Sequence, residues 1–312
     1  MTVIEQSHDD FVRLTGPYRR ELLTHCYRML GSVQDAEDLV QETYLRAWRS
    51  YQDFEGRASL RTWLYRIATN ACLNALRHGN RRVLPAGLGG PATDPIALAP
   101  RDPEIPWLEP IPDEQADPAA IVAGRAGLRL ALIAALQHLP PRQRTVLILR
   151  DVLAWPAEEA ADALGLTPAA VHSTLQRARA RLDRLEPAID EITEPAEPEQ
   201  RDLLDRYADA FERADMVALT RLLTEDAVWQ MPPNPSWFAG RDNVIRLLSA
   251  RLRTKRNQLV AVRANGQPGF AMYRDGEAFA IQVITLRGPA VAAVTSFHDS
   301  ALVQRFGLPP QI

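Results

Sequence analysis

The sequence has few cysteines, no long apolar run and no excess of positive charge. Only Cys26 and Cys72 occur, and each lies within an apolar helical pattern. That usage argues against a disulfide framework or a cysteine-based zinc site and suits a reducing compartment. No run of roughly eighteen apolar residues could span a membrane, and the N-terminus lacks the basic and apolar regions of a secretory signal. We therefore expect a cytoplasmic protein with no membrane segment, metal or cofactor.

The net charge of −3 looks unsuited to a protein that binds DNA, but the charge is unevenly distributed. Residues 121–185 carry nine basic and five acidic side chains, whereas residues 186–200 carry six acidic and no basic ones. A segregated basic block can mark a nucleic-acid footprint. An ordinary solvated surface can carry the same excess, so charge alone leaves both interpretations open.

Composition divides the chain into five segments. Helical patterns cover residues 11–79 and 119–185, and residues 80–118 between them hold nine prolines. Proline removes amide donors and blocks helix formation, so this stretch is expected to be an extended linker. A second, acidic linker is expected over 186–199. From residue 200 to 312, two helical stretches followed by strand-like runs predict an α+β domain.

The sharpest motif is a helix-turn-helix over residues 155–185. Gly165 suits the left-handed conformation at a helix end, Thr167 is a good N-cap, and Pro168 occupies the favoured first position of the second helix. Such a helix can enter a major groove of DNA, although a solvated basic helix of a bundle would show the same pattern. The exposed face of the second helix is expected to carry the candidate DNA contacts, namely His172, Ser173, Gln176, Arg177 and Arg179.

A helix over residues 31–51 presents a cluster of acidic and amide side chains. It is expected to begin near Asp35, and Asp38, Gln41 and Glu42 lie on its outer face. Acids in the first turns suit the helix dipole. The more specific interpretation is a docking face for a basic partner surface.

The next helix, 60–78, is expected to be capped by Ser59 after a loop at 51–59. Arginines and asparagines beside aromatic rings can separate strands and capture an unpaired base, since stacking contributes about 1–3 kcal/mol per base. Trp63 alone is better explained as core, but Asn70 is harder to bury because an amide needs partners. The candidate contacts to an unpaired nucleic-acid strand on this loop and helix are Phe54, Arg61, Trp63, Asn70, Asn74 and Arg77.

Three stretches resemble the extracytoplasmic-function, group 4 branch of the sigma-70 family. The run GSVQDAEDLVQETYLRAW at 31–48 resembles region 2.2, and RTWLYRIATNAC at 61–72 resembles regions 2.3–2.4. Residues 139–182 resemble region 4. The resemblance implies two all-α sigma domains, a region 2 helical bundle and a region 4 helix-turn-helix. It also implies a sigma factor that binds core RNA polymerase and promoter DNA, and that is not an enzyme.

The same resemblance implies roles for individual residues. Asp38, Gln41 and Glu42 match positions that dock on the β′ clamp helices, and the β subunit is implied as a further partner. Phe54 and Asn70 match the pocket for a flipped −10 base. Residues 168–182 match the helix that reads the −35 element. The 80–118 linker would replace region 3 and run toward the RNA exit channel.

The C-terminal segment resembles the SnoaL-like cone fold, in which a sheet curls around a pocket. His298 and Asp299 are neighbours that would point to opposite faces of a strand, so an acid–base pair in the pocket is not expected. The implied role is regulatory, with a small-molecule ligand as one possibility, although several of the pocket candidates suit an ordinary core equally well. They are Trp229, Met231, Trp237, Phe238, Phe297 and His298.

Two alternatives remain at this point: a ligand-sensing helix-turn-helix transcription regulator and an enzyme of the SnoaL class. A regulator would bind DNA without polymerase, usually as a dimer on a palindrome. Neither alternative has a use for the helical pattern at 35–77. The sigma-factor hypothesis is therefore favoured.

Overall fold

The computed structural model describes residues 3–56, 58–77, 79, 81–95, 97–123, 128–184 and 197–312. The chain divides into a helical unit, residues 1–82 and 113–187, and a sheet unit, residues 83–112 and 188–312. Most of the acidic linker expected at 186–199 lies outside the described residues. Across the described part of the chain, every helix is too short or too polar to cross a membrane.

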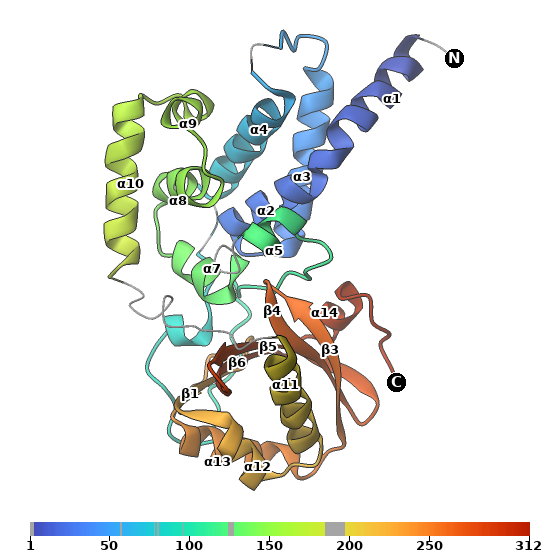
Figure 1. Ribbon diagram of the computed structural model, residues 1–312, viewed down its shortest axis with the longest axis vertical. Coiled ribbons are helices and arrows are strands. Elements are labelled where there is room, and N and C mark those ends of the chain that lie inside the picture. Colours follow the sequence, from blue (N-terminus) through green and yellow to red (C-terminus); the bar gives the residue numbers. More distant parts are fainter. Residues whose placement is uncertain are drawn as a thin grey trace. The chain divides into compact units, whose positions relative to one another are not determined.

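Four helices form the first part of the helical unit (Figure 1). They are α1 (Val3–Thr15), α2 (Arg19–Leu30), α3 (Val33–Arg49) and α4 (Leu60–Ala75), with a 3-10 turn, η1 (Gly16–Tyr18), before α2. Ser32 caps α3 by accepting a hydrogen bond from the Asp35 backbone N–H at 3.2 Å. Ser59 caps α4 in the same way through Thr62 N–H at 3.0 Å. The expected start near Asp35 is wrong, because that carboxylate lies in the first turn and the serine before it is the cap.

Helix α2 is the centre of this bundle. Its Leu22, Tyr27 and Met29 are completely buried. Cys26 on α2 and Cys72 on α4 are free, buried thiols. A hydrogen bond with Cys26, and then burial, raises the pKa of Cys72 well above its usual value. Both cysteines therefore act as small core residues.

The second part of the helical unit contains the helix-turn-helix. Its elements are α5 (Pro118–Ala123), α7 (Leu130–Leu136), α8 (Pro141–Leu147), a π-helical turn η3 (Ile148–Val152), α9 (Ala157–Leu164) and α10 (Pro168–Leu182). Gly165 ends α9 with a left-handed φ of 62°. Thr167 caps α10 by accepting from Ala170 N–H at 3.2 Å, and Val171, Leu175 and Ala178 form its buried face. The predicted helix-turn-helix is confirmed.

The sheet unit is an α+β domain, as predicted. Its six strands follow the order β2-β1-β6-β5-β4-β3, with β1 and β6 parallel and the other neighbours antiparallel. Helix α11 packs on this sheet (Figure 1), where the ring of Tyr207 stacks on Phe270 of β4 at 5.8 Å. The elements are α11 (Glu197–Glu212), α12 (Met216–Leu222), β1 (Leu223–Gln230), β2 (Trp237–Ala239), α13 (Arg241–Leu252), β3 (Asn257–Ala264), β4 (Gln267–Arg274), β5 (Glu277–Arg287), β6 (Ala290–Phe297) and α14 (Ser300–Arg305).

Most of the proline-rich linker is packed on the sheet unit rather than free. Ala92 N–H donates to the carbonyl of Trp237 at 2.7 Å, and the Trp237 indole N–H donates to Gly89 at 2.8 Å. Farther along, Asn234 and Ser236 side chains bond both backbone groups of Ala99. The segment was expected to be a free tether, and this differs from the structure. Backbone groups between the prolines bond residues far away in the sequence, and the composition of the linker does not indicate such partners.

One buried histidine should make the helical unit sensitive to acid. His25 Nε2 lies 2.9 Å from Thr69 Oγ1. Burial, and then the nearby charge of Arg28, lowers the pKa of His25 from 6.5 to about 3. The unfolded chain takes up a proton near pH 6.5 and the folded chain does not until about pH 3. The free energy of unfolding therefore falls as the pH drops below 6.5.

We predict that urea unfolding of the wild type loses about 2 kcal/mol from this residue between pH 7 and pH 5. His25→Asn keeps a group that can bond Thr69 but does not titrate, so its free energy of unfolding should fall less over the same interval. Circular dichroism of the helical signal measures both. Equal losses in wild type and variant would contradict the assignment.

Candidate functional site

The outer face of α3 presents the residues predicted to dock on polymerase. Asp38 and Gln41 are exposed, and Glu42 is half-buried and ion-paired with Arg46 at 2.5 Å. Leu45, which is 58% exposed, follows Asp38 by two helical turns and so lies on the same face. Sequence reasoning missed Leu45. Its signal was an apolar residue out of phase with the buried stripe of the helix.

The polar face of α4 lines a cleft within the helical unit. Asn70, Asn74 and Arg77 are all exposed. Asn70 therefore needs no buried hydrogen-bond partners, because its side chain is exposed and is not part of the core. The cleft has a volume of about 440 Å³. These three side chains and Leu73 face residues of the second half of the unit, namely Pro140, Pro141, Arg142, Leu164 and Leu166.

The aromatic pair at the start of α4 joins the loop to the helix. The rings of Phe54 and Trp63 lie 4.8 Å apart. Trp63 is only 8% exposed, whereas Phe54 is half-buried. Arg61 is engaged with the carboxylate of Glu21 at 2.7 Å, and its guanidinium lies 5.0 Å from the ring centroid of Tyr65. Phe54 is therefore the accessible ring of the pair, and Arg61 is already partnered.

The exposed face of α10 carries most of the predicted −35 contacts. His172, Gln176 and Arg177 are exposed, and Ser173 is half-buried with its hydroxyl bonded to the Ala170 carbonyl at 3.1 Å. Arg179 differs, because its guanidinium makes two bonds to the carboxylate of Asp151, at 2.8 and 2.6 Å. The structure thus separates Arg177, which is exposed and donates to the neighbouring Thr174 hydroxyl at 3.0 Å, from Arg179, which is held against η3.

The two halves of the helical unit contact each other through α4 and α9. The Thr62 hydroxyl lies 2.5 Å from a carboxylate oxygen of Glu159. The rings of Tyr65 and Trp155 pack edge to face at 5.3 Å. The candidate −10 surface therefore faces the helix-turn-helix across the cleft described above.

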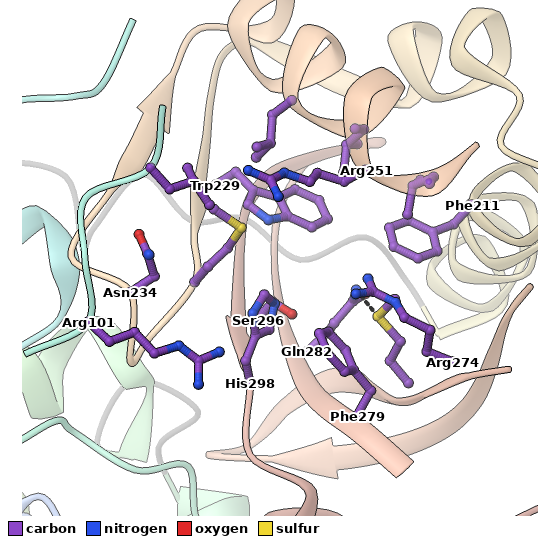
Figure 2. A pocket seen from close by; sticks show the side chains of 16 residues that line it. Arg101, Phe211, Trp229, Asn234, Arg251, Arg274, Phe279, Gln282, Ser296 and His298 are labelled. Carbon is purple, nitrogen blue, oxygen red and sulfur yellow. Dashed lines mark hydrogen bonds between the residues drawn. The ribbon is translucent and has the colours of Figure 1, made fainter. Parts of the chain in front are cut away.

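The sheet unit encloses a cavity of about 260 Å³ (Figure 2). Trp229, Met231 and His298 line it, as predicted. Trp237, Phe238 and Phe297 were also expected to line it, but they do not. Alternation along β6 explains the last error: Ser296 and His298 point into the cavity, so Phe297 between them points to the other face. Trp237 bonds the linker, and Phe238 is completely buried in the core.

Sequence reasoning missed the charged side chains of the cavity. Arg101 comes from the linker, Arg251 from α13 and Arg274 from the end of β4. Figure 2 shows the guanidinium of Arg101 directed toward His298. These residues lie far apart in sequence and outside any apolar pattern. Only their meeting in space reveals a shared site.

His298 lies in a positive and poorly solvated environment. Burial, and then the charges of Arg274, Arg101 and Arg251, lowers the pKa of His298 from 6.5 to about 3. The imidazole is therefore neutral at neutral pH. Asp299 turns away and caps α14, accepting from Ala301 N–H at 2.9 Å. The two neighbours do not form an acid–base pair in the cavity.

A capped helix-turn-helix with an exposed basic face, joined to a second helical bundle, defines a DNA-binding protein of the transcription apparatus. Family models match along the chain: Sigma-70 region 2 at residues 14–82, Sigma-70 region 4 at 129–182, and the SnoaL-like domain at 204–299. The ECF RNA polymerase sigma factor SigG of Mycobacterium tuberculosis is 48% identical over 319 residues, covering 99% of this chain and 86% of that protein. The chain belongs to the extracytoplasmic-function RNA polymerase sigma factors.

A second relative supports the whole architecture. SigJ of Mycobacterium tuberculosis, also an ECF sigma factor, is 29% identical over 295 residues, covering 88% of each chain. The crystal structure of the Mycobacterium tuberculosis sigma factor SigJ matches with a TM-score of 0.64 and 25% identity, covering 95% of this chain and 98% of that one. The protein therefore acts in transcription initiation, with core RNA polymerase and promoter DNA as partners.

We predict that Arg177→Ala weakens binding of the holoenzyme to its −35 element by about 1–3 kcal/mol if this side chain reads a base. Arg179→Ala should cost less, because the wild-type side chain is engaged by Asp151 and a surface ion pair contributes about 0–1 kcal/mol. Fluorescence anisotropy on the −35 duplex and on a scrambled duplex measures both variants. A loss that is equal on the two duplexes would reassign Arg177 to a phosphate contact.

Proposed function

We propose that this sigma factor reads two promoter elements with two surfaces of its helical unit and promotes melting of the start site. Helix α10 would read the −35 element through His172, Gln176 and Arg177. The loop before α4, and α4 itself, would hold the opened −10 element. The observation that carries this proposal is the exposed polar face of α4 beside an accessible aromatic ring. As a polymerase subunit, the protein would work in the cytoplasm.

Base capture at the −10 element is the step we assign to Phe54 and Asn70. Phe54 is accessible and is backed by the buried ring of Trp63 at 4.8 Å, so an unpaired base could stack on it without moving the core. Such stacking contributes about 1–3 kcal/mol per base. Asn70 offers donors and acceptors for a base edge. Asn74 and Arg77 continue the same face toward the DNA backbone.

The contact between α4 and α9 would have to open for this reading to occur. DNA at the −10 surface needs the space that the cleft now shares with Pro141, Arg142 and Leu166. We propose that core polymerase holds the two halves apart and fixes their spacing. The second promoter contact then becomes intramolecular, which raises the overall affinity without new contacts. Isolated sigma factor should accordingly bind promoter DNA poorly.

The sheet unit would regulate this opening through the linker. Residues 83–112 belong to the sheet unit, and Leu108 and Ile111 within them are completely buried. If freed, thirty flexible residues would have a typical end-to-end distance of about 30 Å. Packing on the sheet instead fixes the linker and limits the separation of the two halves. We assign no catalysis to the sheet unit, because no carboxylate joins His298 among the described residues that line its cavity.

The docking face predicts a charge-reversal result. Asp38→Arg with Glu42→Arg should weaken binding to core polymerase at least tenfold while the thermal unfolding midpoint changes little, because both side chains are at the surface. A matched control is Asp205→Arg with Asp209→Arg on α11, which makes the same change of charge at the same spacing on an exposed helix. Affinity measured by biolayer interferometry with core enzyme would contradict the assignment if the two double variants were equal.

Truncation at about residue 190 tests the regulatory role. In transcription assays with core enzyme, we expect the truncated chain to give at least twofold more product than the full chain, because the linker is released. Permanganate reactivity of thymines near the start site should report DNA opening for both proteins. Lower activity of the truncated chain would instead mean that the sheet unit assists initiation. Binding to core without DNA opening would overturn the melting role.

A further inference from the structure

The cavity of the sheet unit is cationic. Arg101, Arg251 and Arg274 line it, and among the described lining residues none is Asp or Glu. Asp275, which follows Arg274 in the sequence, also binds Lys255 Nζ at 2.8 Å and accepts from the Arg256 N–H at 3.0 Å. Three guanidinium groups on a cavity lining that has no carboxylate among its described residues favour a bound anion.

A buried hydroxyl also points to a ligand. Ser296 is 1% exposed, lines the cavity, and its Oγ has no hydrogen-bond partner among the described residues. Leaving such a buried group without a hydrogen-bond partner is unfavourable. His298, two residues along the same strand face, is neutral and can donate one hydrogen bond. Both groups can serve an acceptor oxygen placed between them and Arg101.

Apart from the amides of Asn234 and Gln282, the rest of the cavity lining is apolar. Trp229 and Phe211 stack with their rings nearly parallel at 6.1 Å. The aliphatic and sulfur-containing lining residues are Leu98, Met231, Leu247, Leu248, Leu252 and Met272. A volume of about 260 Å³ lies just below the usual range of small-molecule sites, which begins at about 300 Å³. The ligand that fits combines a small aromatic or aliphatic body with one anionic end.

We infer that the sheet unit binds a small organic carboxylate, with the carboxylate held by Arg101 and Arg274 and the apolar body against Trp229. This inference deepens the regulatory role proposed above and rests on it for its biological meaning. Binding itself can be measured without polymerase. The failure of one proposal is therefore distinguishable from the failure of the other.

The linker takes part in this site. Leu98 and Arg101 belong to it, and Arg251 Nη2 donates to the Pro95 carbonyl at 3.2 Å. A carboxylate bridging Arg101 to the arginines of the sheet unit would fasten residues 95–101 to the domain. Ligand occupancy should consequently stabilise the packed linker.

A charge series on one apolar skeleton tests the ligand class. Isothermal titration calorimetry of the full chain compares 4-phenylbutyrate, its neutral amide and 4-phenylbutylamine, with benzoate and octanoate to vary the body. We expect at least one carboxylate to bind, at least tenfold more tightly than its amide, and the amine not to bind. Equal affinity of acid and amide, or no binding by any of the three carboxylates at millimolar concentration, would overturn the proposal.

Arginine variants locate the anion. Arg101→Gln and Arg274→Gln should each weaken the carboxylate about tenfold and change the affinity of the amide less than twofold. Arg101 is exposed, so its replacement does not put folding at risk. Arg253→Gln is the matched control, since this exposed arginine follows α13 but does not line the cavity. A loss in the control equal to that in both cavity variants would mean nonspecific electrostatic attraction.

Hydrogen exchange of the full chain tests the effect on the linker. The Ala92 and Ala99 amides bond to Trp237 and Ser236, so peptides covering residues 88–106 report its attachment. The best carboxylate should slow their exchange at least threefold, and Arg101→Gln should abolish the effect. Binding without slower exchange would place the anion in the cavity but overturn the bridge to the linker.

Discussion

The guanidinium of Arg144 is the contact on which the helical unit depends. It is 3% exposed and donates to the Met29 carbonyl, to Oε1 and the carbonyl of Gln137 at 2.7 and 3.0 Å, and to the carbonyl of Leu139 at 3.3 Å. Burial lowers the pKa of Arg144 to about 10, so the group stays charged at neutral pH. A buried charge costs several kcal/mol unless its donors are satisfied. The carbonyl groups that accept these hydrogen bonds lie in helix α2 and in the segment before α8. Arg144 therefore holds these two parts of the chain together.

An interface built on such a group can be opened without destroying either half. Each half has its own apolar core, around Tyr27 in the first and around Val171 and Leu175 in the second. Between the halves, the Gln137 amide bonds the Arg28 carbonyl as well as Arg144. On separation, water can solvate these polar groups and recover much of the desolvation cost. Two apolar faces would gain no such compensation, so a polar junction suits the opening of the two halves that we propose.

Local signals in the sequence were enough to predict the helices and strands. They were not enough to predict which residues these elements contact. Gly165, Thr167 and Pro168 fixed the turn and the start of α10 because caps act within a few residues. His298 and Asp299 do lie apart, as expected, but both follow the end of β6, and Asp299 is turned away because it caps α14. In contrast, Asp151 lies 28 residues before Arg179, and nothing in either neighbourhood encodes that pair. The prediction that Phe297 lines the cavity failed for a related reason. Pairing with β5 sets which side chains of β6 face the cavity.

The linker shows how a low-complexity segment acquires a specific role. Prolines at 80–118 exclude a helix, but they leave carbonyl groups and the remaining amides free to bond a surface. The sheet unit supplies that surface through Asn234 and Ser236, and the same segment brings Arg101 to the cavity. If the cavity binds the ligand proposed above, tether length and cavity occupancy become linked equilibria. A ligand that binds the packed form of the linker more tightly than the released form must shift the equilibrium toward packing by that same ratio of affinities. Any partner that pulls the linker away must, in turn, lower the affinity for the ligand by an equal factor.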